Sequence, residues 1–105
     1  MTERVKPEAC ATLTEVRHGI DVVDQMIVAM LGERFSYIEA AARIKNRREA
    51  VRDEARKSQV IEQARRVAGR VGAPDDFIAQ FYELLVETSI EHEFACFDRA
   101  KAVNE

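Results

Sequence analysis

Features that mark specialised classes of protein are scarce in this 105-residue sequence. It has no Trp, only four Gly and two Pro, and no run of about 18 apolar residues. Such a composition excludes a collagen-like chain, a low-complexity linker and a membrane-spanning helix, while the 47% apolar content excludes a disordered acidic tail. Residues 1–6 lack the apolar stretch of a signal peptide, so we expect a soluble, cytoplasmic protein.

Cysteine and net charge are also low. Cys10 and Cys96 lie far apart and form no C-x-x-C pair. A zinc site needs about four ligands, and only His18 and His92 could join the cysteines, at unsuitable spacing. We therefore predict reduced thiols, no metal and no cofactor. The net charge of −3, from 16 basic and 19 acidic residues, gives no sign of nucleic acid as a partner.

Apolar residues recur at helical spacing, and no segment shows the alternation that is typical of a strand. The sequence predicts a polar lead-in over residues 1–12. It then predicts three helices, over residues of about 13–46, 53–71 and 74–102. The charged residues 47–52 are out of phase and predict a loop, while Gly72 and Pro74 predict a turn between the last two helices. The expected fold is therefore all-α, with one long and two shorter helices in a single domain over residues 1–105.

The first predicted helix carries an apolar seam of the coiled-coil kind. Its two rows at seven-residue steps are Leu13, Ile20, Ile27, Arg34 and Ala41, and Val16, Val23, Met30, Tyr37 and Ile44. A helix of about 34 residues spans roughly 50 Å, whereas a compact domain of about 100 residues has a radius of gyration near 13 Å. Two shorter helices cannot cover such a seam. Another chain has to bury it, most simply in a homodimer, although an exposed arm that binds some other protein is the alternative.

Two cations interrupt the apolar pattern of this helix. Arg34 stands within the first row, and a guanidinium is costly to bury without an anionic partner. Lys45 follows eleven residues later, about 20° round the helix and roughly 16 Å along its axis, which leaves room for one small dianion between the two. Ordinary alternatives are a side chain at the edge of the seam or a pair with Glu33 or Glu93 for Arg34, and a helix-end lysine for Lys45.

Three further polar residues are candidates for the same site. Arg17 lies about 25 Å from Arg34 along the helix, so it could reach the same ligand only from a second chain in an antiparallel dimer. Otherwise it is a solvated arginine near the start of a helix. On the last helix, Ser89 and Glu93 share one face. A carboxyl at the end of an apolar stripe is a partner for a buried cation, a protonated donor or simply a solvated glutamate.

The charged residues belong to a longer series of motifs. The series consists of Leu13-x-x-Val16-Arg17, Ile20-Asp21-x-x-Asp24, Leu31-x-x-Arg34, Ala40-Ala41-x-x-x-Ile44-Lys45 and Val51-Arg52-Asp53-x-x-Arg56, then Phe77-Ile78, Phe81-Tyr82, Ser89 and Glu93. Over nearly the full length of the chain it resembles the all-helical chorismate mutases and the related isochorismate-pyruvate lyases. The resemblance implies an intertwined homodimer of three-helix chains with two equivalent sites.

The resemblance also implies roles for the three cations. Arg17 would come from the partner chain and bind a carboxylate of the substrate. Arg34 would bind a carboxylate within its own chain. Lys45 would bind a carboxylate and the ether oxygen of the breaking bond. The expected partner is therefore a small dianion, chorismate or isochorismate.

For the remaining residues, the resemblance implies hydrogen-bonding roles. Asp53 would hold the ring hydroxyl, Arg56 would lie near the site, and Ser89 would assist with a carboxylate or hydroxyl. Glu93 takes a position that is Gln in many members of the family and Glu in the fungal mutases. Lys57 stands where bacterial mutases usually carry a second carboxylate for the ring hydroxyl.

Three functions follow from this pattern. The first is a chorismate mutase, which rearranges chorismate to prephenate. The second is an isochorismate-pyruvate lyase, which releases salicylate and pyruvate; residues 6–10 look closer to the lyases, whereas Asp53 and Ser89 look closer to the mutases. These reactions belong to aromatic amino acid biosynthesis and to salicylate metabolism, respectively. The third, suggested by Lys57, is a catalytically silent helical dimer that binds or regulates a partner enzyme.

Overall fold

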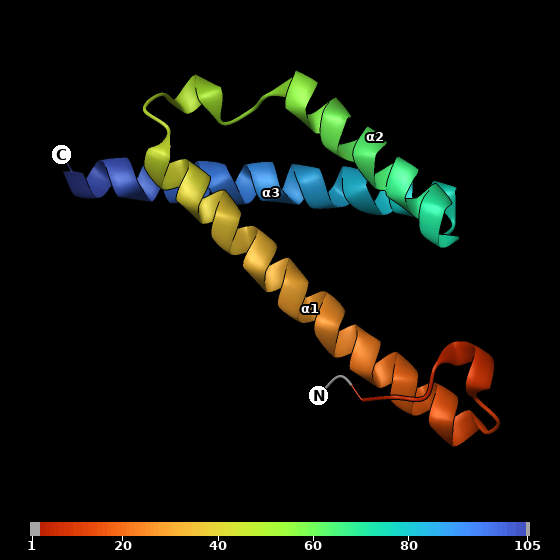
Figure 1. Cartoon of the computed structure of the whole chain (residues 1–105). Coiled ribbons are helices and arrows are strands. Elements are labelled where there is room, and N and C mark those ends of the chain that lie inside the picture. Colours follow the sequence, from red (N-terminus) through yellow and green to blue (C-terminus); the bar gives the residue numbers. More distant parts are fainter. Residues whose placement is uncertain (1–2, 105) are drawn as a thin grey trace. The chain divides into compact units, whose positions relative to one another are not determined.

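The computed structural model of the chain describes residues 3–104, and it contains helices but no strand in that range. The elements in order are a 3₁₀ turn at Pro7–Ala9, helix α1 at Leu13–Ile44, a 3₁₀ turn at Arg48–Ala50, helix α2 at Glu54–Val71 and helix α3 at Asp75–Asn104 (Figure 1). The predicted all-α class with three helices is confirmed. With 30 residues, α3 is nearly as long as α1, which has 32. Among the described residues, no helix combines the length and apolar character needed to cross a membrane.

The start of α1 is fixed by a capping box. The Thr12 hydroxyl oxygen accepts a hydrogen bond from the Glu15 backbone N–H at 3.1 Å, and the Glu15 carboxylate accepts from the backbone N–H of Thr12 at 3.1 Å. The same carboxylate accepts from the Ala11 N–H at 2.8 Å, and this bond, followed by those from Thr12, lowers the pKa of Glu15. The helix therefore begins where its first unpaired N–H groups find local acceptors.

Both ends of α2 follow from local residues. The Asp53 carboxylate accepts a hydrogen bond from the Arg56 N–H at 3.0 Å and caps the start. Gly72 ends the helix with φ of 75°, a left-handed conformation that favours glycine. The Ala73 N–H then bonds to the Ala68 carbonyl at 2.9 Å, which closes the last turn.

The chain comprises two compact units, residues 1–36 and residues 37–105. In the first unit, the lead-in folds back along α1, and the His18 ring lies 3.2 Å from the Glu3 carbonyl oxygen. Between lead-in and helix lies a mainly apolar pocket of about 320 Å³, lined chiefly by Val5, Pro7, Cys10, Val16, Ile20 and Val23. The lead-in thus lies against the side of α1 that carries Val16, Ile20 and Val23.

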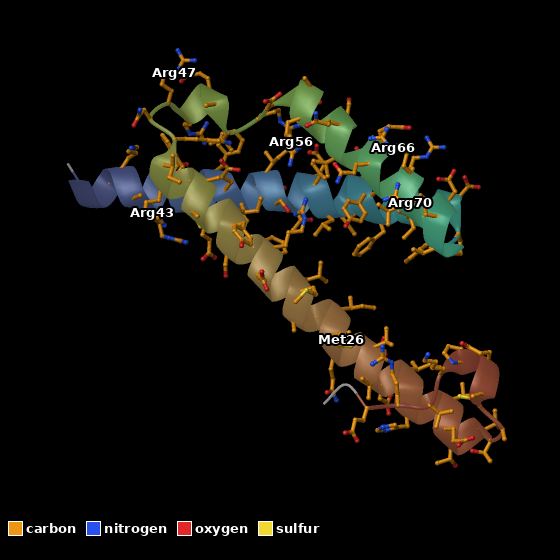
Figure 2. The ribbon with its side chains drawn as sticks, in the orientation of Figure 1. Met26, Arg43, Arg47, Arg56, Arg66 and Arg70 are labelled. Carbon is orange, nitrogen blue, oxygen red and sulfur yellow. The ribbon has the colours of Figure 1, made fainter. Side chains whose placement is uncertain are left out.

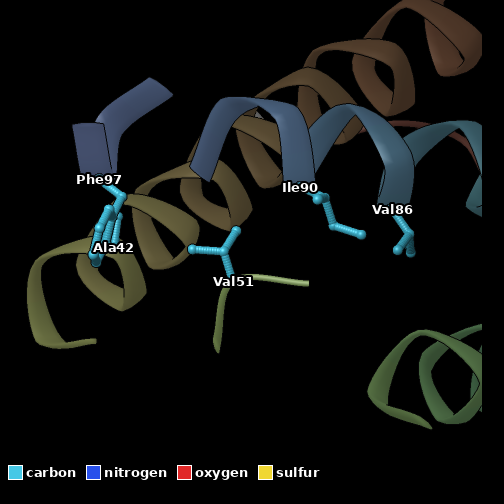
Figure 3. Packing of buried hydrophobic residues seen from close by; sticks show 5 residues of the cluster. All are labelled: Ala42, Val51, Val86, Ile90 and Phe97. Atoms are coloured by element: carbon cyan, nitrogen blue, oxygen red, sulfur yellow. The ribbon is translucent and has the colours of Figure 1, made fainter. Parts of the chain in front are cut away.

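In the second unit, α2 lies along α3 (Figure 1). A buried cluster joins the end of α1, the following loop and α3, and consists of Ala42, Val51, Val86, Ile90 and Phe97 (Figure 3). Val60 and Ile61 of α2 pack against it. These apolar contacts hold the end of α1 beside the middle of α3, which positions the residues that follow α1.

Ion pairs link the start of α2 to α3. The Lys57 ammonium lies 2.8 Å from Glu83 and 2.7 Å from Glu87, and the Arg52 guanidinium lies 2.8 Å from Glu87. The hydrogen bond from Arg52, followed by that from Lys57, lowers the pKa of Glu87 to about 2. Farther along, Arg65 pairs with Asp75 at 2.9 Å.

Most of the apolar seam of α1 is uncovered in the single chain. Leu13 and Ile20 are 67% and 53% exposed, and Met30, Tyr37 and Ile44 are at least 60% exposed. Burying one such side chain is worth about 1.5–3 kcal/mol, so a row of them in water is unfavourable. The exposed seam is the surface for which the sequence predicts a second chain.

The carboxylate of Glu87 should make stability depend on acid pH. Because its folded pKa is about 2 rather than 4.5, its contribution is present above about pH 4.5 and is lost as the pH falls toward 2. In Glu87→Gln, the thermal midpoint should be lowered at pH 7, and the difference from wild type should shrink over that acid range. Circular dichroism melts measure both. Glu91→Gln, at an exposed position of α3, is the control; a difference that stays constant with pH would contradict the prediction.

Candidate active site

A lysine and a glutamate form the centre of the candidate site. Lys45 directly follows α1, and its ammonium nitrogen lies 2.7 Å from Oε2 of Glu93 on α3. The Glu93 side chain is only 6% exposed and that of Lys45 is 29% exposed. The structure therefore pairs Glu93 with Lys45, one of the alternatives that the sequence left open for a carboxyl on this face.

The buried oxygen of Glu93 is incompletely satisfied. Within residues 3–104, its Oε2 atom receives no hydrogen bond of regular geometry, although the Lys45 ammonium is close enough for an ion pair. The charge of the carboxylate is thus compensated, while its hydrogen-bonding capacity is not. Buried polar groups are usually compensated, and here the Lys45 ammonium at 2.7 Å compensates this oxygen.

Ser89 lies one turn before Glu93 on the same face of α3 and is also buried. Its hydroxyl donates a hydrogen bond to the Leu85 carbonyl at 2.6 Å. In this rotamer the hydroxyl would have to turn before it could donate to a ligand. Leu85 and Val86 are buried beside it, which confirms the apolar surroundings expected for this face.

Asp53 and Arg56 lie at the start of α2 and already make local contacts. Asp53 uses Oδ1 to cap the helix, and the Arg56 guanidinium donates to the Gln59 side chain at 2.6 Å. Both residues are exposed, and Arg56 projects from the first turns of α2 (Figure 2). The second carboxylate oxygen of Asp53 is the atom that could hold a hydroxyl.

The ion pairs that Lys57 makes were not predicted from the sequence. Its side chain is 16% exposed, and its ammonium bridges Glu83 and Glu87 of α3. Lys57 therefore joins α2 to α3. A signal was available in the spacing of Glu83 and Glu87, which are four residues apart on one face of a helix.

The remaining two cations belong to the other unit. Arg17 is exposed on α1, and Arg34 is half-buried. Within residues 37–105, the structure brings Lys45 into contact with Glu93 and places Ser89 on the same buried face. Asp53 and Arg56 lie together at the start of α2.

Another contact in this unit was not foreseen from the sequence. The His92 ring lies 2.7 Å from the Glu39 carboxylate, and Cys96 lies 3.6 Å from the same ring. The sequence could have indicated the contact between His92 and Cys96, because residues four apart share one face of a helix. It could not have indicated that Glu39 of another helix also contacts His92.

Comparison with known proteins identifies the family. The family model for chorismate mutase type II matches residues 16–94. The chain belongs to the chorismate mutase type II family. The matched range contains every predicted site residue, from Arg17 to Glu93. The chain is also 29% identical over 87 residues to an isochorismate pyruvate lyase of Pseudomonas aeruginosa, an alignment that covers 83% of this chain and 86% of that protein.

The charged and polar groups of the candidate site suit the binding of a small organic anion. An ammonium and a buried carboxyl oxygen lie together, with a hydroxyl one turn away. Such a set can pair with a carboxylate and contact a second oxygen of the same molecule. Family membership makes the chain an enzyme of the chorismate mutase and isochorismate pyruvate lyase kind.

Two variants of Asp53 should separate its cap from any role in binding. Asp53→Ala should destabilise the chain by about 1 kcal/mol, because the first turn of α2 loses its acceptor. Asp53→Ser keeps an oxygen at the cap and should retain most of that stability. If Asp53 also holds a hydroxyl of the substrate, both variants should raise KM by a similar factor. Thermal melts measure the stability, and steady-state kinetics measure KM. If KM rose only in the destabilised Asp53→Ala variant, Asp53 would act as a helix cap and would have no role in binding the substrate.

Proposed function

We propose that this chain is a chorismate mutase, which converts chorismate to prephenate in cationic pockets shared by two copies of the chain. The observation that carries the proposal is the Lys45 ammonium, held 2.7 Å from the buried carboxylate of Glu93. The family match over residues 16–94 supports it. The reaction is a concerted [3,3] shift, so it requires neither a nucleophile nor a metal.

The first requirement of this reaction is orientation. Chorismate carries two carboxylates and must adopt a compact, chair-like form before the carbon–carbon bond can form. Fixed cations that hold both carboxylates remove that conformational freedom in advance. Arg34 and the partner subunit's Arg17 suit this task, because a guanidinium pairs with a carboxylate through two parallel hydrogen bonds.

The second requirement is stabilisation of developing charge. Negative charge grows on the ether oxygen as the carbon–oxygen bond breaks. A fixed ammonium directed at that oxygen stabilises the transition state more than the ground state. Lys45 is the candidate, because its nitrogen lies 2.7 Å from the buried carboxylate of Glu93.

Glu93 and Ser89 would complete the polar wall of the pocket. Glu93 holds Lys45 in place through its Oε2 atom while it is ionised, and it would donate to an ether oxygen only in its protonated form. The buried Ser89 hydroxyl, after rotation away from the Leu85 carbonyl, would bond to a carboxylate or hydroxyl of the substrate.

The exposed seam of α1 supports a homodimer. Ile20, Met30 and Tyr37 each leave more than half of their surface in water in the single chain. In the proposed dimer a second copy covers this seam, and residues 1–105 act as one domain only in that assembly. The same contact would carry Arg17 of each chain to the site of the other.

The isochorismate-pyruvate lyase reaction is the second candidate, because a protein of that name is 29% identical over most of the chain. The same cradle could hold isochorismate, release pyruvate and leave salicylate without a covalent intermediate. Lys57, which pairs with Glu83 and Glu87, is instead the residue that suggested the catalytically silent dimer. We propose a cytoplasmic location for either enzyme, as the sequence leads us to expect.

Supplying each substrate to the purified chain should decide between the two reactions. With chorismate, we expect prephenate; with isochorismate, a lyase would give salicylate and pyruvate. Lys45→Met and Arg34→Ala should each lower kcat by about 10²- to 10³-fold in the active reaction, because each removes a fixed donor. Arg47→Ala, at an exposed loop position labelled in Figure 2, is the control and should keep activity.

The same assay also shows which alternative would replace the proposed mutase. Salicylate and pyruvate without prephenate would replace the mutase by the lyase. No turnover of either substrate would favour the catalytically silent dimer, in which Arg34→Ala leaves function intact or stabilises the fold. Circular dichroism of each variant separates loss of activity from loss of fold.

Mixed dimers test whether Arg17 serves the site of the other chain. Arg17→Ala and Lys45→Met chains should each be nearly inactive alone. After joint unfolding and refolding, half of the dimers are mixed and each has one intact site, so about a quarter of the wild-type activity should return. If Arg17 acted within its own chain, no site would be restored and the mixture would stay inactive.

A further inference from the structure

Three side chains of different chemistry meet on one side of the unit formed by residues 37–105. Glu39 lies on α1, and His92 and Cys96 lie on α3. Nε2 of His92 is 2.7 Å from Oε2 of Glu39 and 3.6 Å from Sγ of Cys96. All three ligand atoms lie within 4.8 Å of one another.

We propose that Glu39, His92 and Cys96 bind a divalent transition-metal ion of the zinc type. One carboxylate, one imidazole and one thiolate are the donor types that Zn²⁺ accepts, and hard ions such as Mg²⁺ avoid the sulfur. With the thiol deprotonated and the imidazole neutral, the three ligands carry two negative charges. They therefore cancel the charge of the ion and leave its fourth position for water.

The two distances from His92 need only small changes to hold such an ion. Tetrahedral coordination by zinc separates nitrogen and oxygen donors by about 3.3 Å and nitrogen and sulfur donors by about 3.6 Å. The distance between His92 and Cys96 already has the second value. The hydrogen bond between His92 and Glu39 would open to the first value as the ion replaces the proton between them.

The backbone supports this arrangement. His92 and Cys96 are four residues apart on a helix, so their side chains project from one face, one turn apart. Cys96 packs against the buried cluster, whereas His92 and Glu39 are 34% and 53% exposed, so an ion can enter from solvent. Two ligands are thus held on a rigid helix, and the third comes from the end of α1.

A positive neighbour also suits a thiolate at this position. The Arg99 guanidinium donates to Sγ of Cys96 at 3.3 Å. Sulfur bound to a metal remains a hydrogen-bond acceptor, and such outer contacts orient the ligand. Because the ion and its three ligands are together neutral, Arg99 would not repel a charged centre.

Occupancy would tie the end of α1 to α3 beside the candidate active site. Glu39 stands before Lys45 in sequence, and His92 is adjacent to Glu93, so the ion would clamp the two segments that carry the ion pair. An ion bound only by the folded chain stabilises it. The inference concerns a second site and requires no substrate turnover.

Cobalt provides the test, since Co²⁺ takes the place of Zn²⁺ and a thiolate bound to it gives a charge-transfer absorption band. Titration of the tag-free, metal-free chain under reducing conditions should show one Co²⁺ per chain with this band, and Zn²⁺ should displace it. Cys96→Ser should abolish the band. His92→Gln and Glu39→Gln should weaken binding by more than about tenfold, since even a residue that only supports a ligand is worth that much.

The other cysteine and the other histidine serve as matched controls. Cys10→Ser and His18→Gln remove the same chemical groups from residues 1–36 and should leave the titration unchanged. Zn²⁺ should raise the thermal midpoint of wild type and of both controls, but not that of Cys96→Ser. Absence of the band in wild type, or a band that survives Cys96→Ser, would overturn the proposal. Both measurements are made without chorismate or isochorismate, so neither result depends on the proposed enzyme activity.

Discussion

The candidate site depends on one ion pair, between a lysine that follows α1 and a glutamate in the middle of α3. Removing a charged group from water costs several kcal/mol unless an opposite charge accompanies it. The 2.7 Å contact with Lys45 is what allows Glu93 to be almost fully buried. The apolar cluster around Ala42 and Ile90 fixes the register of the two helices, so the packing of the core and the position of the charges are set together.

The second set of charges has a different place in the structure. Lys57 and Arg52 converge on Glu87 at the polar side of α2 and α3, and this concentration of positive charge lowers the pKa of Glu87 to about 2. These groups are more exposed than Glu93, so they orient α2 rather than build a buried pocket. The ion pairs lie near the start of α2, the end of the helix that Asp53 caps, so they also fix the position of Asp53.

The long apolar seam of α1 is the main reason to expect that this chain packs against a second copy. Its residues follow the seven-residue steps of a helix that packs against another helix, yet most of them face water in one chain. The proposed dimer and the proposed active site therefore depend on the same surface. Covering the seam is what would bring the partner subunit's Arg17 to the anion held near Lys45.

Much of this protein could be predicted from local pattern. The helix period, the Thr12 and Glu15 capping box, the Asp53 cap and the Gly72 stop depend on residues close together in the sequence, so the sequence was enough to predict three helices. The family and the candidate residues also followed from motifs along the chain, and the family match confirms the first of these.

Tertiary structure alone decided which of those residues meet. Contacts between helices join positions tens of residues apart, and helical periodicity gives the face of a residue but not its neighbour. Glu93 could have paired with Arg34 or stayed in solvent, and its partner proved to be Lys45. In the same way, the bridge made by Lys57 and the meeting of Glu39 with His92 arise only when α2 and the end of α1 pack on α3.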